Sequence, residues 1–119
     1  MIFQQVFLSF NFSTIVQIMY NEYKNILKRS GGVCILPTET IYGIAGCAED
    51  TKAIDRIYAI KGRNFSKSLA VCVCNLEQAK KYGDFNKYAI KLAKMYWPGP
   101  VTIIVSSKNN IFDERCYLN

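Results

Sequence analysis

The sequence of 119 residues contains no histidine, no Cys-x-x-Cys pair and no GxxxxGK[ST] phosphate-binding motif. Its apolar runs are broken well short of a membrane span. Without histidine, the chain holds no Ser-His-Asp triad, no Cys-His pair and no HExxH zinc site. Any proton transfer must therefore use carboxylates, lysine, tyrosine, cysteine, water or the substrate itself.

The five cysteines are odd in number and lack the paired spacing of a structural zinc site. Cys34, Cys72 and Cys74 lie inside apolar runs, where cysteine behaves as a small hydrophobic residue. We therefore expect reduced, buried thiols of the kind found in cytosolic proteins.

The composition is that of a globular domain, with 50% hydrophobic, 13% aromatic and 20% charged residues. This balance excludes intrinsic disorder and low-complexity repeats. Fifteen lysines and arginines against nine acidic residues give a net charge of +6. A basic surface favours anionic partners such as nucleotides, RNA or phosphate.

Hydrophobic periodicity predicts helices that alternate with short apolar strands. Tyr23, Ile26 and Leu27 share one face of a helix over residues 20–29, which Gly31 and Gly32 end. Further helices are expected at 51–60, 77–82 and 85–96, and strands at 33–36, 69–74 and 101–105. This alternation predicts an α/β fold with helices against a mostly buried sheet.

Residues 1–19 are rich in apolar side chains but do not resemble a signal peptide, since the first basic residue is Lys24. We expect a strand, a packing extension or an over-long assigned start of the sequence here. Residues 37–46 have a polar centre and apolar flanks, which favours a loop at the carboxyl end of a strand. Within it, Gly43-Ile44-Ala45-Gly46 is interpreted as a tight turn rather than an RNA-binding GXXG loop.

Lys61 and Arg63 flank Gly62, and in an extended loop residues i and i+2 point to the same side. Such a pair suits a polyphosphate or a carboxylate, although a solvated basic loop fits the spacing as well. Thr38, Glu39 and Thr40 could orient a small polar ligand or serve as turn and cap residues. Residues 97–100, Trp-Pro-Gly-Pro, favour structural packing before a strand.

Taken in order, these segments resemble the YrdC/Sua5 family of threonylcarbamoyl-AMP synthases. The resemblance covers about residues 20–105. It is carried by GGV at residues 31–33, PTETIYG at 37–43, IYAIKGR at 57–63, KSL at 67–69 and WPGPVT at 97–102.

The resemblance implies a YrdC-like twisted mixed sheet flanked by helices, with a basic concave face. It implies an enzyme that makes L-threonylcarbamoyladenylate and pyrophosphate from ATP, L-threonine and bicarbonate, with Mg2+ and no protein-ligated metal. The product serves N6-threonylcarbamoyladenosine formation at tRNA position 37 through downstream transfer enzymes. It further implies a cytoplasmic protein without a membrane partner, with tRNA or double-stranded RNA as an additional ligand.

The resemblance also implies roles for particular residues. Lys61 and Arg63 match the KxR pair that contacts the ATP triphosphate and serves catalysis, and Phe65 matches a position that touches ATP. The expected threonine-binding wall consists of Thr38, Thr40, Tyr42 and Ala70.

Two family elements, a strand ending in Val-Arg and a later Ser-x-Asn segment, have no match up to Asn119. We therefore expect a partial YrdC-like domain over residues 20–119, preceded by an N-terminal extension over 1–19. Three alternatives follow: an enzyme of this family, either seen as an N-terminal portion or completed by another chain; a non-catalytic RNA- or nucleotide-binding module; and an inactive truncated remnant.

Overall fold

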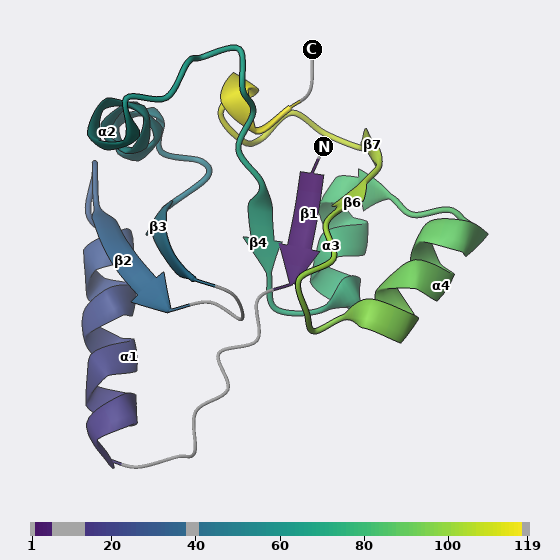
Figure 1. Ribbon diagram of the computed structural model, residues 1–119, viewed down its shortest axis with the longest axis horizontal. Helices are drawn as coiled ribbons and strands as arrows, with labels where there is room; N and C mark the ends of the chain where they lie inside the picture. Colours follow the sequence, from purple (N-terminus) through teal and green to yellow (C-terminus); the bar gives the residue numbers. More distant parts are fainter. Residues whose placement is uncertain (1, 6–13, 38–40, 118–119) are drawn as a thin grey trace. The chain divides into compact units, whose positions relative to one another are not determined.

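The computed structural model describes residues 2–5, 14–37 and 41–117. The chain divides into two compact units (Figure 1). One unit consists of Leu8–Asn64, and the other combines Met1–Phe7 with Phe65–Asn119. Each unit has its own strands and helices and is described by itself.

The unit Leu8–Asn64 pairs a β-hairpin with two helices. Strand β2 (Val33–Pro37) runs antiparallel to β3 (Tyr42–Gly46), with Val33 opposite Gly46 and Pro37 opposite Tyr42. Helix α1 (Thr14–Leu27) contacts β2, and helix α2 (Thr51–Lys61) contacts both strands (Figure 1). The buried side chains of α2 supply most of this core: Ala53, Ile54, Ile57 and Tyr58.

The junction between α1 and β2 is fixed by Gly31 and Gly32. Gly31 has a φ of 71°, a conformation that glycine adopts without a steric penalty. Its N–H donates to the Asp50 carboxylate, and its carbonyl accepts from the Arg56 guanidinium. A Cβ on Gly32 would lie 1.9 Å from the carbonyl oxygen of Ile26, so the chain turns here only with glycine. The predicted end of the first helix is thereby confirmed.

Residues 42–46 form a strand, so the predictions of a loop and of a tight turn at Gly43–Gly46 are wrong for these residues. Glycine at position 46 serves helix packing instead. A Cβ there would lie 3.0 Å from the Cβ of Ala53 and 3.2 Å from the Cδ1 of Ile57. Gly46 thus allows α2 to approach the hairpin closely, a role that glycine plays without any turn.

The second unit is built around a three-stranded sheet in the order β4-β1-β6. Strand β1 (Ile2–Gln5) pairs in parallel with β4 (Val71–Val73) and antiparallel with β6 (Ile103–Ile104). Helix α3 (Leu76–Tyr82) contacts β4, and α4 (Lys87–Tyr96) contacts β6 (Figure 1). A two-stranded ladder joins β5 (Gly83–Asp84) to β7 (Ser106–Ser107), and a 3-10 helix spans Glu114–Cys116.

Short polar side chains begin both helices of this unit. The Asn75 side chain accepts from the N–H of Gln78, and the Asn86 side chain accepts from the N–H groups of Tyr88 and Ala89. Such N-caps satisfy amide groups that have no partner inside the helix. They explain why α4 begins at Lys87, two residues later than the sequence predicts.

The segment after α4 is held by Trp97. Its Nε1 donates to the carbonyl of Val101 over 2.7 Å, and its ring lies edge-on to Phe85 with centroids 6.0 Å apart. The Trp97–Pro98 peptide bond is cis. The predicted structural role of residues 97–100 is confirmed.

The described residues have a mixed α/β architecture consistent with a YrdC-like domain, as expected. Their strands form three small sheets rather than one. The first helix begins at Thr14, six residues earlier than expected, and residues 2–5 form a central strand. The predicted strand over 101–105 is reduced to Ile103–Ile104, because the chain then turns to pair with β5.

The five cysteines, all within the described part of the chain, are thiols rather than disulfides. Cys34 and Cys116 are buried, whereas Cys72 and Cys74 are exposed. The prediction that all the thiols in apolar runs are buried is therefore wrong for Cys72 and Cys74. For Cys72 the reason is strand alternation, because Val71 and Val73 face the core and Cys72 between them faces outward; Cys74 follows the end of β4.

Candidate functional site

Lys61 and Arg63 lie at the C-terminal end of α2. Lys61 is the last helical residue, and Gly62 follows in the left-handed conformation with φ 57° and ψ 32°. The N–H of Gly62 donates to the carbonyl of Ala59, and that of Arg63 donates to the carbonyl of Tyr58 over 3.0 Å. Because Tyr58 is only 2% exposed, this helix cap is anchored in the core of its unit.

This geometry corrects the expectation of an extended loop. The alternation of i and i+2 side chains does not apply, because Lys61 is helical and Gly62 is left-handed. The cap nevertheless holds both cationic residues at one helix end, Lys61 exposed and Arg63 half-buried. A helix C-terminus carries roughly half a negative charge, which two full positive charges outweigh. The end of α2 can therefore attract an anion.

The residues expected to contact threonine are divided along the chain. Thr38 and Thr40 lie outside the described residues. Tyr42 opens strand β3, opposite Pro37, and its side chain is 75% exposed. In the hairpin, Tyr42 stands at the opposite end from Gly46, against which α2 packs. Tyr42 is therefore exposed beside Pro37, at the end of the hairpin where the chain passes from β2 to β3, and a ligand can reach it there.

Phe65 and Ala70 belong to the second unit. Ala70 is exposed and precedes β4, while Phe65, 63% exposed, lines an open pocket of about 550 Å³. The remaining walls of this pocket come from the same unit and are Ser66, Ser68, Glu114, Arg115 and Tyr117. A planar group could stack on the exposed ring of Phe65.

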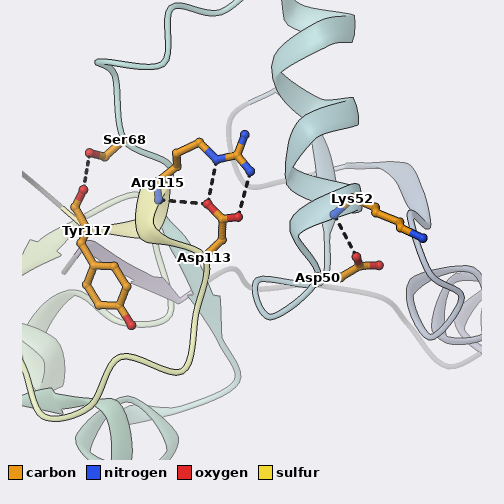
Figure 2. Close-up of polar contacts among 6 residues, drawn as sticks. All are labelled: Asp50, Lys52, Ser68, Asp113, Arg115 and Tyr117. Atoms are coloured by element: carbon orange, nitrogen blue, oxygen red, sulfur yellow. Dashed lines mark hydrogen bonds and ion pairs between the residues drawn. The ribbon is translucent and has the colours of Figure 1, made fainter.

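Another wall of this pocket consists of Glu114, Arg115 and Tyr117. The sequence pattern predicted no role for these residues. Figure 2 shows the Ser68 hydroxyl donating to the carbonyl of Tyr117 over 2.6 Å. One residue on, the N–H of Leu69 donates to the carbonyl of Arg115 over 2.8 Å. The Tyr117 hydroxyl donates to the carbonyl of Asn109 and accepts from the N–H of Phe112. These bonds fasten the C-terminal segment to the stretch before β4.

Arg115 is the charged centre of this segment. Its guanidinium pairs with the Asp113 carboxylate through Nε to Oδ1 at 2.7 Å and Nη2 to Oδ2 at 2.8 Å (Figure 2). Its Cζ also lies 5.6 Å from the centre of the Phe65 ring. Since Asp113 balances its charge, Arg115 acts first as a support for Phe65 and the pocket wall. In the sequence, this ion pair is indicated only by the Asp-x-Arg spacing of Asp113 and Arg115.

Three groups have pKa values displaced from their ordinary range. Hydrogen bonds from the backbone N–H groups of Gly31 and Lys52 lower the pKa of Asp50. Burial raises the pKa of the Cys116 thiol to about 11 and also raises the pKa of Cys34. These groups stabilise the fold rather than supply a reactive centre.

Across residues 2–5, 14–37 and 41–117, no cluster of three or more histidine, cysteine, aspartate or glutamate side chains could hold a metal ion. None of the helices described is long and apolar enough to cross a membrane.

Comparison with known proteins supports the expected family. The family model Sua5/YciO/YrdC, described as telomere recombination, matches residues 25–117. This match begins five residues later than the resemblance noted above and continues past Val105 to Tyr117. It thus includes the pocket wall formed by Glu114, Arg115 and Tyr117, as well as the KGR segment at residues 61–63. No solved structure matches the chain.

Several curated relatives are similar to most of this chain. Threonylcarbamoyl-AMP synthase of Psychromonas ingrahamii is 39% identical over 95 residues, which cover 76% of this chain and 49% of that protein. The Bacillus subtilis protein of the same name is 34% identical and covers 75% of this chain and 26% of its own length. The Homo sapiens protein of that name is 34% identical, and the match covers 70% of this chain and 29% of that protein.

The chain thus spans at most about half the length of these curated relatives. The family model, in contrast, covers well over half of this chain. The matched residues include the capped end of α2, the hairpin and the Phe65 pocket. The chain therefore belongs to the Sua5/YciO/YrdC family.

Proposed function

We propose that this chain takes part in the synthesis of L-threonylcarbamoyladenylate from ATP, L-threonine and bicarbonate. The observation that carries the proposal is the capped end of α2, which holds Lys61 and Arg63 together within the region of the family match. The names of the relatives supply the reaction, and the chemistry of the two cations suits its anionic substrate.

Lys61 and Arg63 would bind the triphosphate of ATP, with Mg2+ entering as part of that substrate. The carbamate formed from threonine and bicarbonate would attack the α-phosphorus, and pyrophosphate would leave. Negative charge grows on the phosphate oxygens during this step, and fixed cations stabilise such charge. Lys61 offers a point charge and Arg63 a planar fork of donors, so the two are not interchangeable.

The other proposed contacts are assigned residue by residue within each unit. Thr38, Thr40, Tyr42 and Ala70 would contact threonine, and Phe65 would contact ATP. The exposure of Tyr42, Phe65 and Ala70 supports these roles, because each can be reached by a small molecule. We propose that residues 20–119 carry the substrate contacts, while residues 2–5 supply the central strand β1 and residues 14–19 the first part of α1.

The product would serve N6-threonylcarbamoyladenosine formation at tRNA position 37 in the cytoplasm. Transfer enzymes would act downstream, and tRNA or double-stranded RNA would be a further ligand. The net charge of +6 supports an anionic partner. The chain spans at most about half the length of the relatives named above.

The first experiment is pyrophosphate release by the purified chain with ATP, L-threonine, bicarbonate and Mg2+. Threonine-dependent release supports the synthase. ATP or RNA binding without release indicates a binding module, and RNA binding should then weaken steeply with salt. A folded chain that neither binds ATP nor releases pyrophosphate indicates an inactive remnant.

Two substitutions test the site itself. Lys61→Ala and Arg63→Ala should each weaken ATP binding by about tenfold or more, since a hydrogen bond to a charged group contributes about 1.5–3 kcal/mol. The matched control is Lys94→Ala, which removes an exposed cation from helix α4. Equal ATP affinity in all four proteins would contradict the assignment of the pair.

A further inference from the structure

Helix α4 exposes three of its large apolar side chains. The residues that it buries against its unit are two alanines, Ala89 and Ala93. Tyr88, Leu92 and Met95 are instead 65%, 44% and 60% exposed. A surface helix ordinarily turns its large apolar residues toward the core and its polar residues toward water. Burial within the unit therefore does not account for these three residues.

The three exposed residues form one continuous row, which we call the outer row. Tyr88, Leu92 and Met95 are spaced i, i+4 and i+7, so they lie within about 60° of the helix circumference and span about 10.5 Å of its length. Tyr96, which is 48% exposed, adjoins the row at its C-terminal end. Figure 1 shows α4 beside α3, at the margin of its unit. Single exposed apolar residues are common, whereas contiguous groups of them mark interaction sites.

A second row, of lysines, runs beside the outer row. Lys87, Lys91 and Lys94 are exposed, and each immediately precedes a member of the outer row. The lysine row is thus displaced by one residue, about 100° around the helix. The Nζ of Lys87 lies 5.1 Å from the centre of the Tyr88 ring, so the two rows meet at the N-terminal end. Residues 87–96 include no aspartate or glutamate, so the helix itself offers no carboxylate to balance the lysines.

The two rows together specify the chemistry of a complementary surface. Apolar side chains at i, i+4 and i+7 are the anchors by which an amphipathic helix docks on another protein. Three positive charges along one edge favour a partner with carboxylates along the facing edge, because complementary charges fix the register of an interface. A second amphipathic helix meets both requirements, with an apolar stripe against the outer row and a line of acidic residues against the lysines.

Other occupants match the surface less well. A second copy of this chain would bring another α4 without carboxylates and a net charge of +6. Nucleic acid would contact the lysines, but Leu92 and Met95 provide neither a ring for stacking nor a hydrogen-bonding group for base edges. Binding to a lipid surface grows with the apolar area that is buried, whereas the outer row covers only about two helical turns.

We propose that the outer row and the lysine row of α4 form a docking surface for an acidic amphipathic helix of another protein. The apolar contacts provide affinity, and the lysines select acidic partners and reject basic ones. Because few side chains anchor it, the interface is small and the complex is transient. The surface shares no residue with the proposed synthase site, so the two proposals succeed or fail separately.

The first test measures binding of the full chain to a synthetic acidic peptide by fluorescence anisotropy. The peptide has about 18 residues, enough to form a helix in water, with leucines at i, i+4, i+7 and i+11 and glutamates on both sides of them. A second peptide carries lysine in place of every glutamate. The chain should bind the glutamate peptide at least about tenfold more tightly than the lysine peptide, and salt should reduce the difference. Equal binding of the two peptides, or no binding of the glutamate peptide, overturns the proposal.

Substitutions in each row locate the binding surface. Leu92→Ala, at the centre of the outer row, should weaken binding of the glutamate peptide by about tenfold. Lys91→Glu should weaken it at least as much, because like charges then face each other. The matched controls lie in the other unit: Ile60→Ala removes an exposed aliphatic side chain from α2, and Lys24→Glu reverses an exposed lysine of α1. Both controls should bind as the parent does, and an equal loss in a control overturns the assignment to α4.

Three further measurements decide whether the surface is free and what occupies it. Met95→Ala should leave the midpoint of urea unfolding unchanged, because a lower midpoint would mean that the chain itself covers the outer row. Sedimentation should show no dimer that Leu92→Ala dissolves, since such a dimer would assign the face to a second copy. Phosphatidylglycerol vesicles and double-stranded RNA are the remaining probes. Binding to either that is tighter than to the glutamate peptide, and that Leu92→Ala abolishes, overturns the proposal.

Discussion

The Arg115 guanidinium and the Asp113 carboxylate form a two-pronged ion pair within one turn of chain. Nε and Nη2 of Arg115 lie 2.7 and 2.8 Å from the two carboxylate oxygens, and the Arg115 N–H also donates to Asp113 over 3.0 Å. The side chains are only 13% and 4% exposed. The pair fixes the segment whose backbone accepts from Ser68 and Leu69, and so it supports the pocket at Phe65.

Asp113→Ala should be strongly destabilising, because it leaves the Arg115 charge largely buried without its partner. Breaking a buried pair costs about 3–5 kcal/mol, and the residual exposure of Arg115 places this case near 3 kcal/mol. Urea unfolding measures the loss. The control is Glu114→Ala, an exposed neighbouring carboxylate, which should change stability by less than about 0.5 kcal/mol. Equal effects in the two variants would contradict the role given to the ion pair.

Gly62→Ala should lower the stability of the α2 end by about 1 kcal/mol, the cost of the left-handed conformation for a residue with a Cβ. Apart from the neighbouring residues of the chain, no atom lies within 4 Å of the added Cβ, so the penalty comes from the local backbone conformation and not from a clash with another part of the fold. Gly62→Asn is the matched control and should cost less, because asparagine tolerates this conformation better. Thermal unfolding of the parent, Gly62→Ala and Gly62→Asn proteins measures the order of their stabilities. An alanine variant as stable as the parent would refute the capping argument.

Asp50→Ala should destabilise the unit Leu8–Asn64 at neutral pH. Asp50 accepts from the N–H groups of Gly31 and Lys52, and these bonds lower its pKa from the ordinary value of 3.8. A lowered pKa means that the stabilisation is present above pH 3.8 and is lost as the pH falls through the lower, folded-state value. The difference in unfolding free energy between the parent and Asp50→Ala should therefore become smaller as the pH falls. A difference that stays constant between pH 7 and pH 2 would contradict this account.

The stability of the chain should fall between pH 9 and pH 11 in part because of Cys116. Burial raises the pKa of its thiol from 9.0 to about 11, so the unfolded chain loses this proton before the folded chain does. The stabilisation is complete below pH 9 and is lost as the pH rises through the folded-state value. Cys116→Ala should show a shallower decline in unfolding free energy over this range. Cys47→Ser should keep the parent slope.

Local sequence signals predicted most of the helices correctly. Residues 51–60 were expected to be helical, and α2 spans Thr51–Lys61, because an N-cap, an apolar stripe and a terminal glycine all lie within the segment. The start of α1 at Thr14 was missed, because the pattern of Tyr23, Ile26 and Leu27 marks only its last turns. Helix ends depend on contacts with the rest of the chain as well as on the helix itself.

Strand pairing was predicted less well. Residues 42–46 contain two glycines and read as a loop, yet they form β3 because β2 is available to pair with them. Cys72 was expected to be buried because the surrounding residues are apolar, whereas it lies between the buried Val71 and Val73 on the exposed face of β4. In both cases a partner distant in sequence decided the outcome.

In the candidate site, too, local sequence signals predicted one part and tertiary structure decided the other. The residue types at Lys61 and Arg63 indicated an anion site, but their arrangement on a capped helix end came from the fold. The sequence alone determined the α/β class, the helices and the family, because periodicity, caps and ordered motifs are local properties of the chain. Strand partners, thiol exposure and the Asp113–Arg115 support of the Phe65 pocket were decided by tertiary structure, since each requires residues that only folding brings together.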